Sequence, residues 1–223
     1  MHLGIVEPDT SRRRIEVLRE MLLALGQDNA ETIKLVRQPN GKQKLEFDDG
    51  LKWHCNFSRV RNAPQAFGLV AISGKTELGI DVETWPKTET NPDFLESIST
   101  SEDMRAIQSL SGFAQDASLA LWVIKEAALK CAGEVMIDPR HLAVSVFRDG
   151  VYRTSPSLLA GAPVPDIIVA LFHLSALKWP DTEFLCGIAM PSSENIIREG
   201  LLNPVLTGTG WQIAALNTRM HSK

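Results

Sequence analysis

Residues 78–83 carry the sequence Leu78-Gly79-Ile80-Asp81-Val82-Glu83, in which apolar side chains alternate with small or acidic ones. Alternate residues of an extended chain point to opposite sides, so the apolar side chains share one face and Asp81 and Glu83 the other. Residues two apart on a strand lie about 7 Å from each other, so one cation between the two carboxylates could be shared. The simpler alternative is a strand with an apolar core face and a solvent-exposed acidic face.

A second informative stretch, residues 117–132, is rich in strong helix formers and is followed by Gly133, which predicts a helix that ends there. At about 100° per residue, Trp122, Glu126 and Lys130 fall within an arc of about 80°, while Lys125 lies off the other side of Trp122. The simpler alternative is an exposed i,i+4 ion pair between Glu126 and Lys130, worth about 0.3–0.5 kcal/mol and without a catalytic role.

Together the two stretches supply oxygen ligands for a hard cation, a base for a nucleophile and an ammonium for phosphate charge. These groups are the requirements of magnesium-assisted phosphoryl transfer. No P-loop and no G-x-G-x-x-G run occurs in the chain, which argues against a nucleotide kinase or a Rossmann enzyme.

Both stretches resemble the signature motifs of the 4′-phosphopantetheinyl transferases, specifically the larger Sfp-like class, which folds as a pseudo-dimer within one polypeptide. That family carries a strand motif (V/I)G(I/V)D(I/V)E and a helix motif W-x-x-KE-(S/A)-x-x-K. A third family block, GKP followed by F-N-(L/I)-S-H-S, is matched in part by Gly41-Lys42-Gln43 and by Cys55-Asn56-Phe57-Ser58-Arg59-Val60. Ser101-Glu102 corresponds to an acidic family position upstream of the helix. The resemblance spans about residues 18–150.

The resemblance implies an α+β fold of two similar lobes, each a small antiparallel sheet packed on a long helix. An N-terminal lobe that binds cofactor phosphates is expected at residues 1–76, and a metal-binding, catalytic lobe at residues 77–190. Residues 191–223 would form a C-terminal tail. Leu3-Gly4-Ile5-Val6-Glu7 echoes the acidic strand motif, which gives weak support for an internal duplication.

The implied activity is transfer of 4′-phosphopantetheine from coenzyme A to a serine of an acyl, polyketide or peptidyl carrier protein, as in a holo-acyl-carrier-protein synthase. By the same resemblance, Mg²⁺ would be held by Asp81, Glu83 and Glu126, Glu126 would also act as the base, and Lys130 would neutralise the phosphate under attack. 3′,5′-ADP would leave. The cofactor-binding residues implied by the resemblance and by the pool of cations are Lys42, Lys44, Ser58, Arg59, Lys75, Lys125 and Lys130.

Two departures from the family pattern bear on activity. Arg59 stands where the family has His, and Gln43 stands where it has Pro. Arginine is a permanently charged, planar cation that binds phosphate in a bidentate way but cannot carry a proton. Arg59 therefore keeps open a second possibility, a non-catalytic relative that binds coenzyme A or a carrier protein. A different metal-dependent phosphoryl hydrolase is a third possibility, although no second acidic cluster for a two-metal site is apparent in the sequence.

Charge divides unevenly along the chain. Residues 1–76 hold 12 Lys and Arg against 9 Asp and Glu, a net charge of +3, and residues 77–223 hold 11 against 18, a net charge of −7; the sum is −4. This division fits one lobe that binds phosphates and another that binds a metal. Nucleic-acid binding is a poor interpretation, because the pI of about 5.8 is acidic. The candidate phosphate contacts are Arg12-Arg13-Arg14, Arg37, Lys42, Lys44, Arg59, Arg61 and Lys75.

The three cysteines, Cys55, Cys131 and Cys186, are scattered, which predicts reduced, buried thiols, and the five histidines show no zinc-site spacing with them. The N-terminus lacks the basic-then-apolar pattern of a secretory signal, and no apolar run approaches membrane-spanning length. We therefore expect a cytoplasmic monomer without membrane association.

Overall fold

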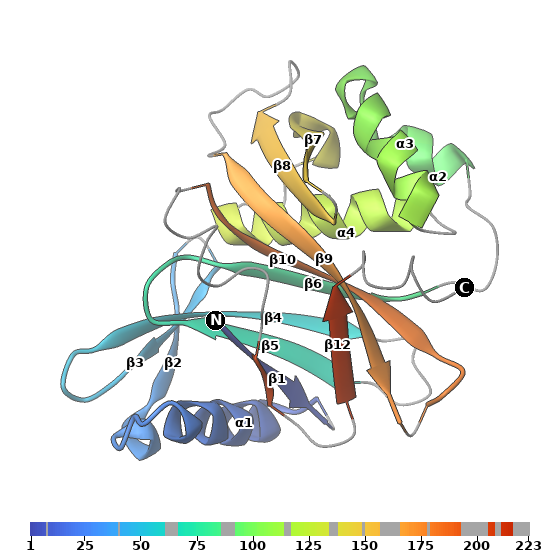
Figure 1. The fold of residues 1–223 in the computed structure, drawn as a ribbon. Coiled ribbons are helices and arrows are strands. Elements are labelled where there is room, and N and C mark those ends of the chain that lie inside the picture. Colours follow the sequence, from blue (N-terminus) through green and yellow to red (C-terminus); the bar gives the residue numbers. More distant parts are fainter. Residues whose placement is uncertain are drawn as a thin grey trace.

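The computed structural model describes residues 1–7, 9–39, 41–60, 67–85, 92–113, 117–133, 138–148, 150–156, 166–177, 179–192, 205–207 and 211–215. Within these ranges the chain forms two sheets that face each other, and each sheet is covered by helices on its outer side (Figure 1). One core lies between the sheets, and one lies between each sheet and its helices. This is the α+β fold of two sheet-and-helix lobes that the sequence predicts.

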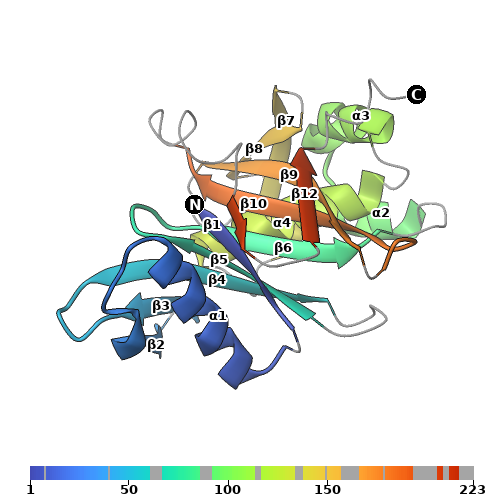
Figure 2. The ribbon, with the colours of Figure 1, turned by 60° about the horizontal axis from the view of Figure 1, so that its bottom comes forward.

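The first sheet has the strand order β11-β1-β5-β4-β3-β2. Its strands are β1 (His2–Val6), β2 (Lys34–Arg37), β3 (Gln43–Glu46), β4 (Lys52–Val60), β5 (Phe67–Ser73) and β11 (Val205–Thr207). Helix α1 (Ser11–Ala24) lies across the face of this sheet that points away from the second sheet (Figure 2). The helix begins at Thr10, whose side chain accepts a hydrogen bond from the Arg13 amide, and it buries Val17, Leu18, Met21 and Leu22.

The second sheet has the strand order β6-β10-β9-β8-β7, with β12 also paired to β9. Its strands are β6 (Gly79–Thr84), β7 (Leu142–Arg148), β8 (Val151–Pro156), β9 (Ile167–Ala176), β10 (Glu183–Pro191) and β12 (Trp211–Ala215). Its outer face packs on the long helix α4 (Ala117–Ala132), and the shorter helices α2 (Pro92–Ile98) and α3 (Met104–Phe113) pack on α4 in turn. Helix α4 is nearly enclosed, because most of its side chains are buried.

The two lobes have the same topology. In each lobe the first strand leads into helical structure, a four-strand meander follows, and the last strand of the meander pairs antiparallel with the first strand. Gly4 of β1 and Gly79 of β6 occupy equivalent places in this plan. A Cβ at Gly4 would lie 2.4 Å from the sulfur of Met21, and a Cβ at Gly79 would lie 2.0 Å from the carbonyl oxygen of Ala127. Both glycines let a helix approach its sheet closely, so the topology supports the duplication that the short sequence echo suggests.

The C-terminal segment joins the lobes. Strand β11 pairs in parallel with β1 of the first sheet, and β12 pairs antiparallel with β9 of the second. Trp211 packs against Phe67, Trp179 and Phe184 in an aromatic cluster at the core between the sheets. The segment expected as a C-terminal tail therefore contributes two strands, and the remainder of residues 193–223 lies outside the described residues.

The predicted bounds of α4, residues 117–132, coincide with the observed ones, and the strand predicted over residues 78–83 is observed as β6. Strands β8, β11 and β12 and helix α2 are not predicted from the sequence. Strand β8 is short and runs directly into a stretch rich in Pro, Ala, Ser and Gly, which predicts a loop; the part of that stretch from residue 157 to 165 lies outside the described residues. No helix among the described residues has the length and apolar character needed to cross a membrane.

Candidate active site

Asp81 lies in the middle of β6 and is only 3% exposed. The alternation of residues 78–83 is confirmed, since Ile80 and Val82 enter the core between the sheets while Asp81 points to the other side. The simpler alternative of a solvent-exposed acidic face is wrong for Asp81. Its carboxylate is covered because α4 packs against this face of β6, and Ser58 of β4 reaches it from the first lobe.

Lys130 of α4 forms an ion pair with Asp81. Its Nζ lies 2.5 Å from Asp81 Oδ1 and 3.5 Å from Ser58 Oγ, and the Ser58 hydroxyl donates to the same carboxylate oxygen at 3.0 Å. The other oxygen, Asp81 Oδ2, is buried and accepts no hydrogen bond from any described residue. A buried carboxylate oxygen without a partner is costly, and it is a position where a bound cation would be stabilised.

Glu83 and Glu126 interact electrostatically with Asp81. Burial, with repulsion from Asp81, raises the pKa of Glu83 to about 7, although Lys130 and a hydrogen bond from Trp122 act in the opposite direction. Burial also raises the pKa of Glu126, with Asp81 adding to the shift and Lys130 opposing it. The structure thus places the three predicted metal ligands and the predicted catalytic lysine within electrostatic reach of one another. Trp122, Glu126 and Lys130 are partly exposed among buried neighbours on α4, as the predicted helical arc requires.

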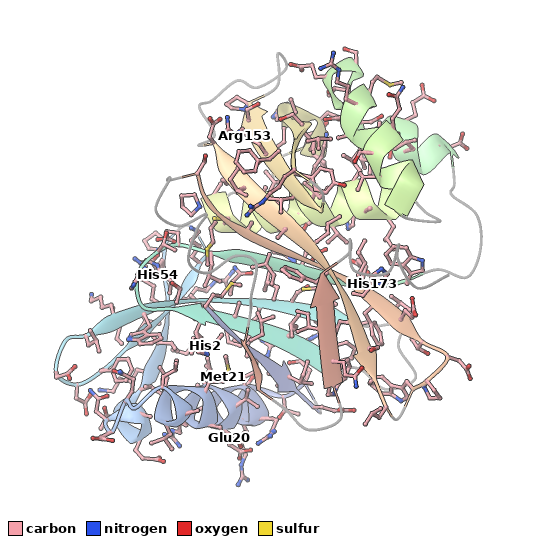
Figure 3. All side chains as sticks on the ribbon, in the orientation of Figure 1. His2, Glu20, Met21, His54, Arg153 and His173 are labelled. Carbon is pink, nitrogen blue, oxygen red and sulfur yellow. The ribbon has the colours of Figure 1, made fainter. Side chains whose placement is uncertain are left out.

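The side chains as they stand do not form a closed metal site, since no three His, Cys, Asp or Glu residues of the described chain are grouped so that they could hold an ion. The chemistry of the group nevertheless suits Mg²⁺, which prefers oxygen ligands and is commonly bound by a few carboxylates together with waters. The unpartnered Asp81 oxygen, and the repulsion from Asp81 that adds to the effect of burial on the pKa values of Glu83 and Glu126, both favour a bound cation. The described histidines labelled in Figure 3, among them His54 and His173, lie apart from one another.

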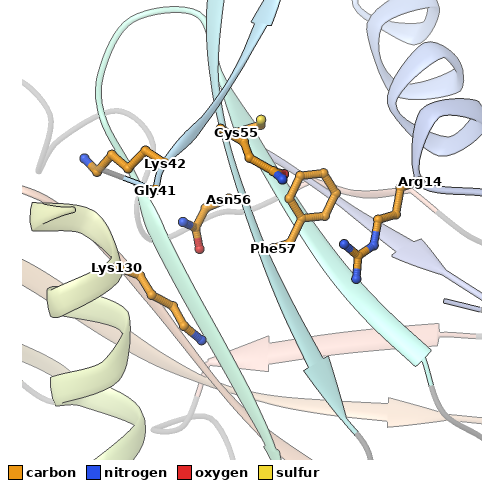
Figure 4. Close-up of a pocket in the computed structure, with 8 residues that line it drawn as sticks. Arg14, Gly41, Lys42, Cys55, Asn56, Phe57 and Lys130 are labelled. Carbon is orange, nitrogen blue, oxygen red and sulfur yellow. The ribbon is translucent and has the colours of Figure 1, made fainter. Parts of the chain in front are cut away.

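A pocket of about 190 Å³ adjoins the carboxylates. Lys130 enters it from α4, Arg14 enters it from α1, and Asn56 and Phe57 of β4 lie between them (Figure 4). The residues that line the pocket are Arg14, Gly41, Lys42, Gln43, Cys55, Asn56, Phe57 and Lys130. Three of them are cations and none is a carboxylate, so the pocket suits an anionic ligand.

Two of the predicted cofactor-binding lysines gather around Glu77. Lys42 Nζ lies 2.5 Å from Glu77 Oε2 and also donates to the Cys131 carbonyl at the end of α4. Lys44 Nζ lies 3.7 Å from the other Glu77 oxygen. Lys42 lines the pocket and Lys44 does not. Lys75 is exposed in the turn after β5 and does not line the pocket. It acts on the amino-terminal group of the chain, whose pKa is lowered first by burial and then by repulsion from Lys75.

Lys125 lies outside the group, although it adjoins Glu126 in sequence. Its side chain is 0% exposed, and its Nζ donates to Asp103 Oδ2 at 2.8 Å and to the Ile98 carbonyl at 2.9 Å. Asp103 also accepts from the Thr100 and Val144 amides. Burial lowers the pKa of Lys125, against the opposing effect of Asp103. The neighbouring Glu102, which matches an acidic family position, is exposed.

Arg59, in the place of the family His, points to the opposite face of β4 from Ser58. It pairs with Asp9, whose side chain is buried and also binds Arg14 through both oxygens, at 2.6 and 2.8 Å. Arg14 in turn lies over the ring of Phe57, 5.1 Å from its centre. Among the described residues, Arg59 does not line the pocket, and Asp9 and Arg14 connect it to the pocket. Arg61, another candidate phosphate contact, lies outside the described residues.

Three residues at or near the site have no role in the sequence-based interpretation: Asn56, Asp9 and Asp103. Asn56 Oδ1 accepts a hydrogen bond from the Ile80 amide at 3.0 Å. Asp103 could have been found as the last residue of a Thr100-Ser101-Glu102-Asp103 capping box, and that box is present. Nothing local marks Asp9, because its arginine partners are brought together only by the fold.

Residues 77–180 match the sequence model of the 4′-phosphopantetheinyl transferase superfamily. This part of the chain belongs to that superfamily. The region of the chain that matches the superfamily includes Asp81, Glu83, Glu126 and Lys130, which interact with one another in the structure. The basic pocket, by contrast, is built mostly from residues that precede the matched region. No curated protein matches the chain.

Proposed function

We propose that the protein transfers the 4′-phosphopantetheine group of coenzyme A to a serine hydroxyl of a carrier protein, with Mg²⁺, and releases 3′,5′-ADP. The proposal is finer than the superfamily membership, which supports phosphopantetheinyl transfer in general. The observation that carries it is the contact between an acidic half-site and a basic half-site. Lys130 belongs to both, since it pairs with Asp81 and lines the pocket of Arg14 and Lys42.

The residues divide the work by charge. Arg14, Lys42 and Lys130 would hold the phosphates of coenzyme A in the pocket, and the N-terminal lobe supplies most of them. Asp81, Glu83 and Glu126 would hold Mg²⁺, which supplies charge neutralisation for a diphosphate when it is bound. Glu126, whose pKa burial raises, would take the proton of the attacking serine. Lys130 would stabilise the charge on the phosphate under attack.

Three of the lysines that the resemblance and the cation pool suggest as cofactor contacts receive other roles in this proposal. Lys125 is enclosed with Asp103, so we assign it to the fold of α4 and not to the cofactor. Lys44 and Lys75 lie outside the pocket lining and would contribute at most long-range attraction. The protein would act in the cytoplasm, where its three buried cysteines stay as free thiols.

A direct assay tests this proposal. The purified protein is incubated with an apo carrier protein, coenzyme A and Mg²⁺, and the carrier is analysed by mass spectrometry for a phosphopantetheine adduct on its serine. The adduct should form, should require Mg²⁺, and should be lost with Asp81→Asn, which keeps the shape of the side chain and removes its charge. Absence of the adduct with carriers of fatty-acid, polyketide and peptide synthesis would reject the proposal.

One observation favours a second candidate, a relative that binds coenzyme A or a carrier without turnover. Arg59 replaces the family His and is committed to Asp9, so that position offers no proton carrier. Under this alternative, the protein would bind coenzyme A in a calorimetric titration, and the same mixture would leave the carrier serine unmodified.

A further inference from the structure

The acidic strand β6 is the last strand of its sheet, and its outer edge meets the face of β4 in the other lobe. On its inner side β6 pairs with β10 through residues 79–84. On its outer side no described strand continues the ladder, and edge-strand amides without a partner are costly when they are buried. Two side chains of β4 take the place of a neighbouring strand there.

Asn56 and Ser58, two residues apart on β4, accept the hydrogen bonds of two β6 amides that are also two residues apart. Asn56 Oδ1 accepts from Ile80 N at 3.0 Å, and Ser58 Oγ accepts from Val82 N at 3.2 Å. The spacing matches because alternate residues of a strand project to the same side. The residue between the two bonded amides is Asp81.

Ser58 acts on the carboxylate as well as on the backbone. Its hydroxyl donates to Asp81 Oδ1 at 3.0 Å, which leaves Asp81 Oδ2 as the oxygen without a described partner. Ser58 is only 7% exposed and Asn56 lies at the pocket wall. One side chain thus fixes both the backbone that carries Asp81 and the direction in which its free oxygen points.

We propose that Asn56 and Ser58 are positioning residues, which replace the missing strand neighbour of β6 and hold the Asp81 carboxylate in the orientation that the transfer reaction requires. The kinetic part of this inference rests on the proposed function. The resemblance assigns Ser58 to cofactor binding, and the geometry assigns it to Asp81. The two assignments predict different kinetic changes.

The test compares two substitutions of the same shape, Ser58→Val and Ser58→Thr, because valine lacks the hydroxyl that threonine keeps. Loss of a group that orients a metal ligand typically costs about 10–100-fold in metal affinity or activity. Ser58→Val should therefore lower kcat by at least about 10-fold and raise the Mg²⁺ concentration for half-maximal rate by a similar factor. The KM for coenzyme A should stay within about 2-fold, and Ser58→Thr should restore most of the rate.

A matched control is Ser73→Val. Ser73 is also 7% exposed, and its hydroxyl also accepts hydrogen bonds from two backbone amides, those of Lys75 and Thr76, at 3.3 Å each. Unlike Ser58, Ser73 has no described contact with Asp81, Glu83 or Glu126, and it does not line the pocket. This control should leave kcat and the Mg²⁺ requirement unchanged. A Ser58→Val enzyme with unchanged kcat and Mg²⁺ requirement would overturn the inference, and so would a change confined to the KM for coenzyme A.

Amide hydrogen exchange, followed by NMR, tests the inference without any turnover. In the wild-type chain the Ile80 and Val82 amides should be protected although β6 is a sheet edge. Ser58→Val should reduce the protection of Val82 by about 10-fold, and Asn56→Leu should do the same for Ile80, which corresponds to loss of about one ordinary hydrogen bond. If the wild type transfers nothing, the proposed function fails while this measurement still decides the inference. Fast exchange of both amides in the wild type would overturn it, even if a variant does not fold.

Discussion

Helix α4 carries two lysines, and each forms an ion pair with an aspartate from another element; the two pairs differ in burial and in how many of their hydrogen bonds are made. The pair of Lys125 and Asp103 is fully enclosed, and Asp103 also satisfies two backbone amides. The pair of Lys130 and Asp81 is less complete, because Lys130 is 19% exposed and Asp81 keeps one oxygen without a described partner. Two further carboxylates, Glu83 and Glu126, lie beside this second pair.

The difference shows that one helix can hold both a fully satisfied ion pair and an ion pair with capacity left for a ligand. A fully enclosed ion pair is tolerated when all of its hydrogen bonds are made, and no ligand can then reach its members. A pair with an unpartnered oxygen can still bind a ligand, and the ligand can then supply the missing partner of that oxygen. The following predictions test this distinction, and they run from the largest expected effect to the smallest.

The largest expected effect is on stability. Lys125→Met removes one partner of a buried pair and leaves Asp103 charged and enclosed, so the free energy of unfolding should fall by about 3–5 kcal/mol. Urea unfolding followed by circular dichroism measures this change. The folded fraction should keep its KM for coenzyme A. A variant with wild-type stability and a much higher KM would return Lys125 to the cofactor site.

The second effect is on turnover. Lys130→Met should lower the transfer rate by about 100-fold, the loss expected when one charge-stabilising group of an active site is removed. Because Asp81 stays buried without its partner, the free energy of unfolding should also fall, but by less than for Lys125→Met, since Lys130 is 19% exposed and water reaches this pair. The rate is read by mass spectrometry of the carrier, and the stability by urea unfolding. If the two variants Lys125→Met and Lys130→Met lost stability equally, the distinction between the pairs would be lost.

A third effect is on pH dependence. The folded pKa of Glu83 is about 7 and its ordinary value is 4.5. Between these values the native state holds a proton that the unfolded chain has released, so stability should fall as pH rises from about 4.5 to 7. Solvent screening of this partly exposed group limits the loss to about 1 kcal/mol, or about 2–4 °C in Tm.

Thermal unfolding at several pH values, with and without Mg²⁺, measures this loss. Glu83→Gln should flatten the profile over that range, and Mg²⁺ should raise the Tm of the wild type most at the higher pH values, where Glu83 is ionised. A profile that is the same in the wild type and in Glu83→Gln would show that Glu83 is an ordinary surface carboxylate.

The smallest effect concerns a third buried aspartate, Asp9, which resembles Asp103 in being well satisfied. Arg59→His should change the transfer rate by less than about 3-fold, because Arg14 alone still binds both oxygens of Asp9 and retains its place in the pocket. A steady-state comparison with the wild type measures this. A large gain in rate would indicate that Arg59 limits catalysis, and a large loss would place Arg59 at the ligand itself.

Local sequence predicted the elements well where the pattern was strong. The alternation of residues 78–83 and the helix former content of residues 117–132 located β6 and α4, and the helical arc selected Glu126 and Lys130. It failed where a neighbour in space decided the outcome. The alternation places Asp81 on the face away from the core, but it cannot show that α4 and Ser58 cover that face.

The sequence by itself determined which side chains share a face, because the spacing of residues along a strand and along a helix fixes their directions. Only the tertiary structure decided that Lys125 is enclosed while Lys130, five positions later, meets Asp81. It also decided that Asn56 and Ser58 of one lobe hold the acidic strand of the other. The physical reason is that burial and hydrogen-bond partners depend on the packing of segments far apart in the chain, and no local pattern encodes that packing.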